Sequence, residues 1–237
     1  LAAAALVLCA QTSDQLLRLR TLGKAFYENP TTQTQAVEQF KQAWQLNPKS
    51  ATDRLNYALA LLRAGNAKDG VTELEATQKM DPKLPHTWFN LGIEYKKMGE
   101  TDRAIAELEQ MARLVPGEPI TQYNLGVLFK AAGRSPEANA KFALSARLDP
   151  NFAAPHFQLF NFHRQQGQAD RAKEELARFQ ELKRRHEEAG TGNEDVEWSL
   201  YSEVYDSIDP RLAADPRPAV APKFATTAQW ASAEQAE

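Results

Sequence analysis

The apolar residues of this chain recur at helical spacing, and the pattern itself repeats. Between residues 85 and 118 they fall three and four positions apart in two runs, which predicts a pair of amphipathic helices joined by a glycine turn. The positions of the pattern are Trp88, Leu91, Gly92, Tyr95, Gly99, Ala104, Leu108 and Met111. Prolines close successive units 34 residues apart, at Pro48, Pro82, Pro116 and Pro150. A single pair cannot bury its apolar face, so we expect the pairs to stack.

This pattern resembles the tetratricopeptide repeat family. The period, the Leu-Gly pair of the first helix, the small alanine of the second helix and the closing proline are together typical of that family. The resemblance implies an all-α fold, an α-solenoid of helix-turn-helix repeats over residues 13–190. We expect five repeats, at about residues 15–50, 51–84, 85–118, 119–152 and 153–190.

Some copies depart from the pattern. The turn at residues 28–35 is longer than the others, Arg54 stands where Trp88 stands in the third copy, and Phe160 replaces the glycine of the Leu-Gly pair. We expect helix starts capped by Ser13 and Ser135. The charged residues 181–188 are expected to prolong the last helix, because the outer face of a terminal repeat must meet water.

The two ends of the chain differ from the repeats. Residues 1–10 are short, apolar and rich in alanine, and we interpret them as the remnant of a bacterial signal peptide, which implies a periplasmic or extracellular protein. A lipid anchor at Cys9 and an ordinary buried helix turn are the alternatives. Residues 191–237 are acidic and proline-rich, which predicts a mostly irregular tail or linker. Its aromatic residues Trp198, Tyr201 and Tyr205 are expected to dock against another surface.

Composition excludes several classes of function. A net charge of -3 gives no general case for nucleic-acid binding. The chain has four histidines and one cysteine, which favours neither a metal site nor an internal disulfide. No apolar run reaches the length of about 18 residues that spans a membrane. We recognise no phosphate loop or catalytic constellation, and therefore expect no enzyme, no cofactor and no metal.

The resemblance implies that the first helices line a concave groove that binds a peptide. An asparagine before the Leu-Gly pair recurs as Asn56, Asn90 and Asn124, and an amide offers a donor and an acceptor to a peptide backbone. The alternative is that this asparagine is an ordinary helix residue. By spacing, the other inward positions are Phe89, Ile93, Lys96, Lys97, Tyr123, Val127, Lys130, Phe157, Asn161 and Arg164.

These positions predict a groove with an apolar floor and a basic edge. Such a groove suits a hydrophobic, acidic segment of another protein, for which the aromatic residues supply affinity and the basic residues supply selectivity. The alternative is that neighbouring helices cover the floor and water covers the basic edge. The tail at residues 191–237 has the same acidic and aromatic character, so it is also a candidate occupant.

The sequence therefore predicts an exported protein-interaction scaffold. A second hypothesis is that the repeats are a spacer or docking arm of a larger exported protein, because Tyr201 to Asp209 resembles bacterial proteins in which such repeats precede an integrin-like β-propeller. A third is an arm that presents protein substrates to a glycosyltransferase, which the asparagine series also suits.

Overall fold

A computed structural model describes residues 2–188, with side chains described for residues 12–185 and for Glu188. Within these residues the protein is all α-helical, and consecutive helices pack as pairs, as the sequence predicted. No described helix combines the length and the apolar character that crossing a membrane requires. The helices belong to two compact units, with the boundary between Leu91 and Gly92.

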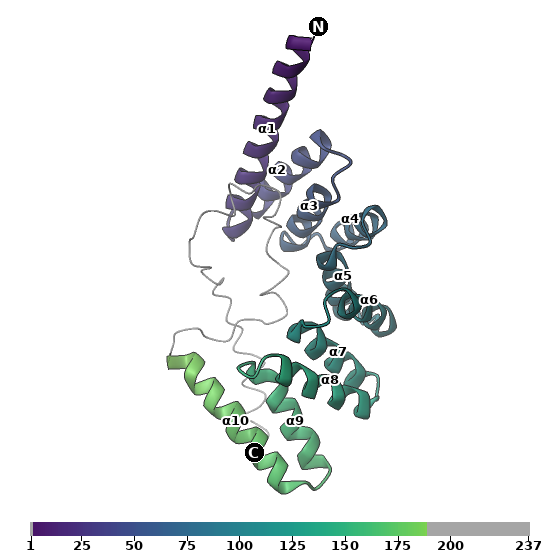
Figure 1. Ribbon diagram of the computed structural model, residues 1–237, viewed down its shortest axis with the longest axis vertical. Coiled ribbons are helices and arrows are strands. Elements are labelled where there is room, and N and C mark those ends of the chain that lie inside the picture. The colour runs from purple at the N-terminus through teal and green to yellow at the C-terminus, as the bar shows by residue number, and fades with distance from the viewer. Residues whose placement is uncertain (1, 189–237) are drawn as a thin grey trace. The chain divides into compact units, whose positions relative to one another are not determined.

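The first unit contains α1 (Ala2–Glu28), α2 (Gln33–Leu46), α3 (Ala51–Arg63), α4 (Ala67–Met80) and the beginning of α5 (Pro85–Lys97). Within it, α1 packs on α2, α2 on α3 and α3 on α4 (Figure 1). Its core is made by side chains that face the neighbouring helix, among them Phe40, Leu55 and Leu74.

The second unit contains the end of α5, α6 (Thr101–Leu114), α7 (Pro119–Ala131), α8 (Ser135–Leu148), α9 (Ala153–Gln165) and α10 (Ala169–Glu188). From α6 onward each helix packs on the next one in the chain (Figure 1). The helices α3, α5, α7 and α9 begin at Ala51, Pro85, Pro119 and Ala153, so their starts are 34 residues apart.

The turns inside the pairs show why the period is so regular. Gly65, Gly99, Gly133 and Gly167 have φ angles of +83°, +76°, +73° and +68°, the left-handed conformation that glycine adopts without steric cost. The first pair has no such glycine. Its turn is one residue longer, from Asn29 to Thr32, and the Thr32 hydroxyl donates to the Phe26 carbonyl over 2.9 Å.

Small residues let the two helices of a pair approach closely. A Cβ atom added at Gly126 would lie 2.6 Å from the Phe142 ring, and one added at Gly92 would lie 2.6 Å from Leu108. The alanines expected at the contact on the second helices, Ala104, Ala138 and Ala172, are buried. In the last pair Phe160 stands in place of the glycine; it is half-buried and its ring lies 6.0 Å from that of Phe157.

The helix starts differ in detail from the sequence prediction. Ser13 was expected to cap a helix, and this is wrong, because α1 is already helical from Ala2. At α8 the cap position is Arg134 and Ser135 is the first helical residue, one position earlier than expected. That residues 1–10 are a signal-peptide remnant stays a prediction. The tail, with its aromatic residues and the stretch compared with propeller proteins, lies outside the described residues.

A buried ionic contact that the sequence did not reveal joins α1 to α3. Arg20 donates two hydrogen bonds to the carboxylate of Asp53, both 2.7 Å long, and Asn47 donates a third over 3.0 Å. Asp53 is only 1% exposed, so its charge depends on these donors. Next to it in sequence, Arg54 lies over the Trp44 ring and pairs with Glu73 at 2.7 Å. Arg54 thus makes a cation-π contact and an ion pair at the position that Trp88 occupies in the third repeat.

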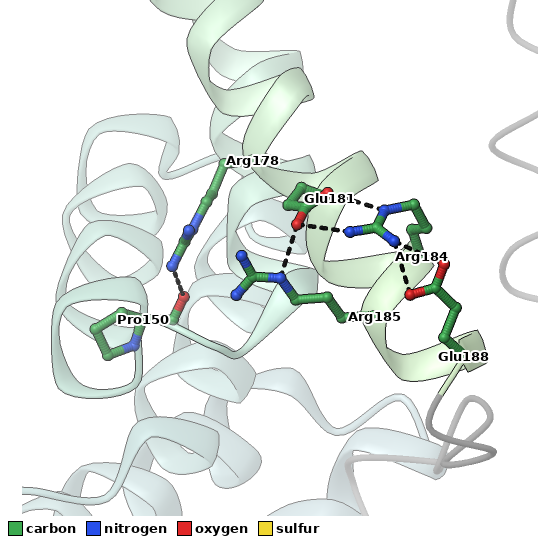
Figure 2. A network of polar contacts seen from close by, with 6 residues as sticks. All are labelled: Pro150, Arg178, Glu181, Arg184, Arg185 and Glu188. Atoms are coloured by element: carbon green, nitrogen blue, oxygen red, sulfur yellow. Dashed lines mark hydrogen bonds and ion pairs between the residues drawn. The ribbon is translucent and has the colours of Figure 1, made fainter.

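The last helix is longer than the other second helices and carries a charged network. Arg184 pairs with Glu181 and Glu188, and Arg185 also pairs with Glu181 (Figure 2). Arg178 donates to the carbonyl of Pro150 over 2.9 Å, which ties α10 to the loop before α9. On the packed side of α10, Phe179 and Leu182 are buried against Ala153. This division of faces is the one expected for a terminal helix.

We expect Gly126→Val to destabilise the protein by about 1 to 3 kcal/mol, because the new side chain overlaps the buried Phe142 ring. The measurement is the free energy of unfolding from urea denaturation followed by circular dichroism. Gly117→Val is the control, since no atom lies within 4 Å of a Cβ at that position. Equal stability of the two variants would contradict the close approach.

Candidate partner-binding surface

The residues predicted to bind a partner all lie on the first helices of the pairs, α3, α5, α7 and α9. Their exposure divides them into two groups. The side chains with at most 4% exposure are Asn56, Phe89, Asn90, Ile93 and Asn124. The half-buried or exposed side chains are Lys96, Lys97, Tyr123, Val127, Lys130, Phe157, Asn161 and Arg164. All of the second group belong to the unit that begins at Gly92.

Asn124, one of the asparagines expected to hold a peptide, uses both ends of its side-chain amide in hydrogen bonds within the repeats. The amide nitrogen of Asn124 donates to the Ile120 carbonyl over 3.1 Å, within its own helix. Its oxygen accepts from the ammonium of Lys96 over 3.2 Å. Asn124 is 0% exposed, so its hydrogen bond with Lys96 joins α5 to α7 beneath the surface.

The same contact recurs one repeat later. Lys130 on α7 donates to the side-chain oxygen of Gln158 on α9 over 2.9 Å. Gln158 occupies the position of Asn124 in the next repeat, so both bonds join residues 28 apart. The basic series and the amide series, predicted as two separate features of a groove, are therefore paired with each other in this unit. Lysine donates and amide oxygen accepts, from one first helix to the next.

The charges of this surface are only partly compensated. Lys97 pairs with the buried carboxylate of Glu94 at 2.8 Å. Lys130 bonds to a neutral amide, and the guanidinium of Arg164 lies 5.4 Å from the centre of the Phe160 ring. Within residues 12–185, no carboxylate lies within ion-pair distance of Lys130 or Arg164, and both side chains are exposed. These two cations are thus open to an anionic partner. We call Lys97, Lys130 and Arg164 the basic row.

The aromatic residues of the predicted floor are partly used by packing within the unit. The ring of Tyr123 lies 5.7 Å from that of Phe142 on α8 and 5.2 Å from that of Phe152. The ring of Phe157 lies 5.1 Å from that of Phe179 on α10. Both side chains stay half-buried, so part of each remains exposed. Val127, one turn before Lys130, is also half-buried.

The histidines have local roles. His156 lies 2.7 Å from Glu175, and His163 lies 2.7 Å from Gln168, each through its Nδ1 atom. Among the residues that the structure describes, no cluster of three or more histidine, cysteine, aspartate or glutamate side chains is placed to hold a metal ion. On α5, burial lowers the pKa of His86 to about 4, so this side chain is neutral at pH 7.

A family model described as tetratricopeptide repeat matches residues 89–151, which run from α5 to the loop after α8. Residues 89–151 carry tetratricopeptide repeats. The match covers two pairs in which the glycine of the first helix and the alanine of the second are both present and buried, and it includes the Lys96 to Asn124 bond. Among the curated proteins, none matches this chain.

Solved structures of the protein MamA have the same fold. MamA 41-end from Desulfovibrio magneticus RS-1 is 18% identical, with a TM-score of 0.65 over 72% of this chain and 96% of that chain. A MamA RS-1 double mutant is 17% identical, with a TM-score of 0.66 over 74% and 98%. MamA AMB-1 is 23% identical, with a TM-score of 0.58 over 71% and 98%. At these identities the likeness establishes the fold alone.

We expect the protein to lose stability as the pH falls from about 6.5 toward 4, through His86. The folded-state pKa lies below the usual 6.5, so the unfolded chain takes up the proton first and is favoured. The contribution of neutral His86 to the free energy of unfolding is fully present above pH 6.5, and about 2 kcal/mol of it is lost by pH 5. Urea denaturation at pH 7.5 and at pH 5 measures this loss of unfolding free energy. In His86→Gln the difference between the two pH values should shrink by that amount; an unchanged difference would contradict the assignment.

Proposed function

We propose that this protein is an interaction scaffold that binds a hydrophobic, acidic segment of another protein on the first-helix surface of its second unit. The observation that carries the proposal is the basic row, in which Lys130 and Arg164 are exposed and bonded only to neutral groups. Positive charges gathered on one face attract anionic partners, and Lys130 and Arg164 both lie on first helices of this unit, which supports an anionic partner there.

Apolar contacts beside the row complete the proposed recognition. Val127 lies one helical turn before Lys130, and Phe157 lies two turns before Arg164, so each apolar side chain shares a helix face with a cation. Exposed ion pairs contribute only about 0 to 1 kcal/mol each, and they select and steer more than they hold. The half-buried Tyr123, Val127 and Phe157 would supply most of the affinity.

The partner is a peptide or an extended segment of a protein. The tail of the chain itself is one candidate, because Glu194 to Asp209 combines acidic residues with Trp198, Tyr201 and Tyr205. Its connection to α10 would give it a high effective concentration at the surface. The apolar, alanine-rich composition of residues 1–10 supports export to the periplasm or the cell exterior as the setting of this interaction.

The test is a peptide library displayed on phage and selected on the full chain, with a synthetic peptide of residues 194–209 as an additional probe. We expect the selected peptides to combine aspartate or glutamate with aromatic or aliphatic residues. Reversing the basic row with Lys97→Glu, Lys130→Glu and Arg164→Glu should weaken their binding at least tenfold in fluorescence anisotropy. Binding of these peptides should also weaken as salt is raised.

The matched control changes three exposed cations on the second helices of the same unit, Arg113→Glu, Arg147→Glu and Lys173→Glu. It alters the net charge by the same amount as reversal of the basic row but leaves the first helices unchanged. An equal loss of binding in this control would show that only net charge matters. Peptides without acidic residues would contradict the proposed partner.

A further inference from the structure

A small cavity of about 50 Å³ lies between α7, α8 and α9, where the Lys130 to Gln158 hydrogen bond crosses from one repeat to the next. Its polar wall comes from all three helices. Lys130 belongs to α7, Ser135 and Asn139 to α8, and Gln158, Asn161 and Gln165 to α9. Phe142 and Phe162 supply apolar wall. Lys130 is the only charged residue among those that line the cavity.

The ammonium of Lys130 is available to a stronger acceptor. Its described hydrogen bond goes to the neutral oxygen of Gln158 over 2.9 Å. A charged group bonded to a carboxylate is held more strongly than one bonded to an amide. An ammonium group has three N–H donors, so Lys130 can donate to a new acceptor without losing its hydrogen bond to Gln158.

Asn139 adds a second, independent sign of an incomplete site. Its side-chain oxygen is shielded from solvent and has no hydrogen-bond partner among the described residues. This oxygen only accepts hydrogen bonds, and an ionised carboxylate has no proton to donate, so an entering carboxylate would bind the nitrogen of Asn139 rather than its oxygen. The nitrogen and oxygen of such an amide exchange places by a half-turn, so Asn139 can also present a donor.

The size of the cavity limits what can enter it. A water molecule needs about 10 to 15 Å³ of cavity volume, so 50 Å³ admits about three to five groups of that size. The three heavy atoms of a carboxyl group fit this space. Ser135 at the start of α8 adds the positive end of a helix dipole, which favours an anion over a neutral group of equal size.

We propose that this cavity is the subsite for a single aspartate or glutamate side chain of the partner segment, bound by the ammonium of Lys130 and by the surrounding amides. The assignment rests on the proposed function, since it places one acidic residue of the bound segment. Of the three cations in the basic row, Lys130 thus binds one acidic side chain of the segment. The other two, Lys97 and Arg164, attract the negative charge of the segment without binding a particular side chain.

The cavity can be tested without knowing the natural partner. The probe is N-acetylglutamate N-methylamide, titrated into the isotope-labelled full chain, with N-acetylglutamine N-methylamide as the isosteric neutral probe. We expect the glutamate probe to shift the NMR signals of the side-chain amides of Asn139, Gln158 and Asn161, with an affinity at least tenfold above that of the glutamine probe. Lys130→Gln should abolish the difference.

A matched variant separates this site from lysine-to-amide contacts in general. Lys141 on α8 donates to the side-chain oxygen of Gln122 over 3.0 Å and does not line the cavity, so Lys141→Gln should leave the titration unchanged. Equal binding of the two probes would overturn the carboxylate assignment. Survival of the glutamate shifts in Lys130→Gln would overturn the role of the lysine.

Peptides selected on the full chain provide the second readout. Replacing each acidic residue of a bound peptide by its amide should identify one position whose effect disappears in Lys130→Gln. If peptides bind but no position couples to Lys130, and the glutamate probe gives no shifts, the subsite is wrong while the proposed function stands. If no peptide binds, the proposed function fails, and the small probe alone decides whether the cavity takes a carboxylate.

Discussion

Close packing of paired helices at one small residue per repeat is the constraint on which the rest of this structure depends. Gly126 faces the ring of Phe142, and Gly92 faces Leu108, with no room for a methyl group at either site. This approach brings the second helix against the first, and in the four pairs after the first a left-handed glycine makes the short turn that it requires. Because the geometry is the same in successive pairs, equivalent positions of the first helices fall into register, and a series such as Lys96 and Lys130 can form.

The fold could be predicted from the sequence because the repeat signals are local. Glycine in the turn, alanine at the contact and proline at the close each have one physical reason to occupy their positions. The Arg20 to Asp53 contact was not predictable in this way, since it joins residues 33 apart in two different pairs and occurs once among the described residues. The helix start at Ala2 was missed because a good cap residue, Ser13, also tolerates the interior of a helix.

The candidate surface was predictable in position but not in detail. Spacing placed the amide and lysine series on the same helices, yet gave no indication that they bond to each other 28 residues apart. That pairing leaves Asn124 engaged within the repeats and leaves the charge of Lys130 without an opposite charge. Two successive first helices of the second unit can thus be joined by a lysine and a neutral acceptor, and the positive charge of Lys130 stays exposed. Lys130 then has two roles. Its ammonium bonds one repeat to the next, and the same ammonium is the group proposed to recognise the partner.

The charged network on α10 bears on how such an array can grow. A copy of residues 85–118 duplicated in place would meet neighbours whose faces already match it, because each pair is built to contact another like it. A copy joined directly after α10 would instead meet Arg184, Arg185 and their glutamate partners, whose charges are paired with one another on a partly exposed surface. Gene duplication can therefore lengthen this protein from within, while the end of α10 resists extension.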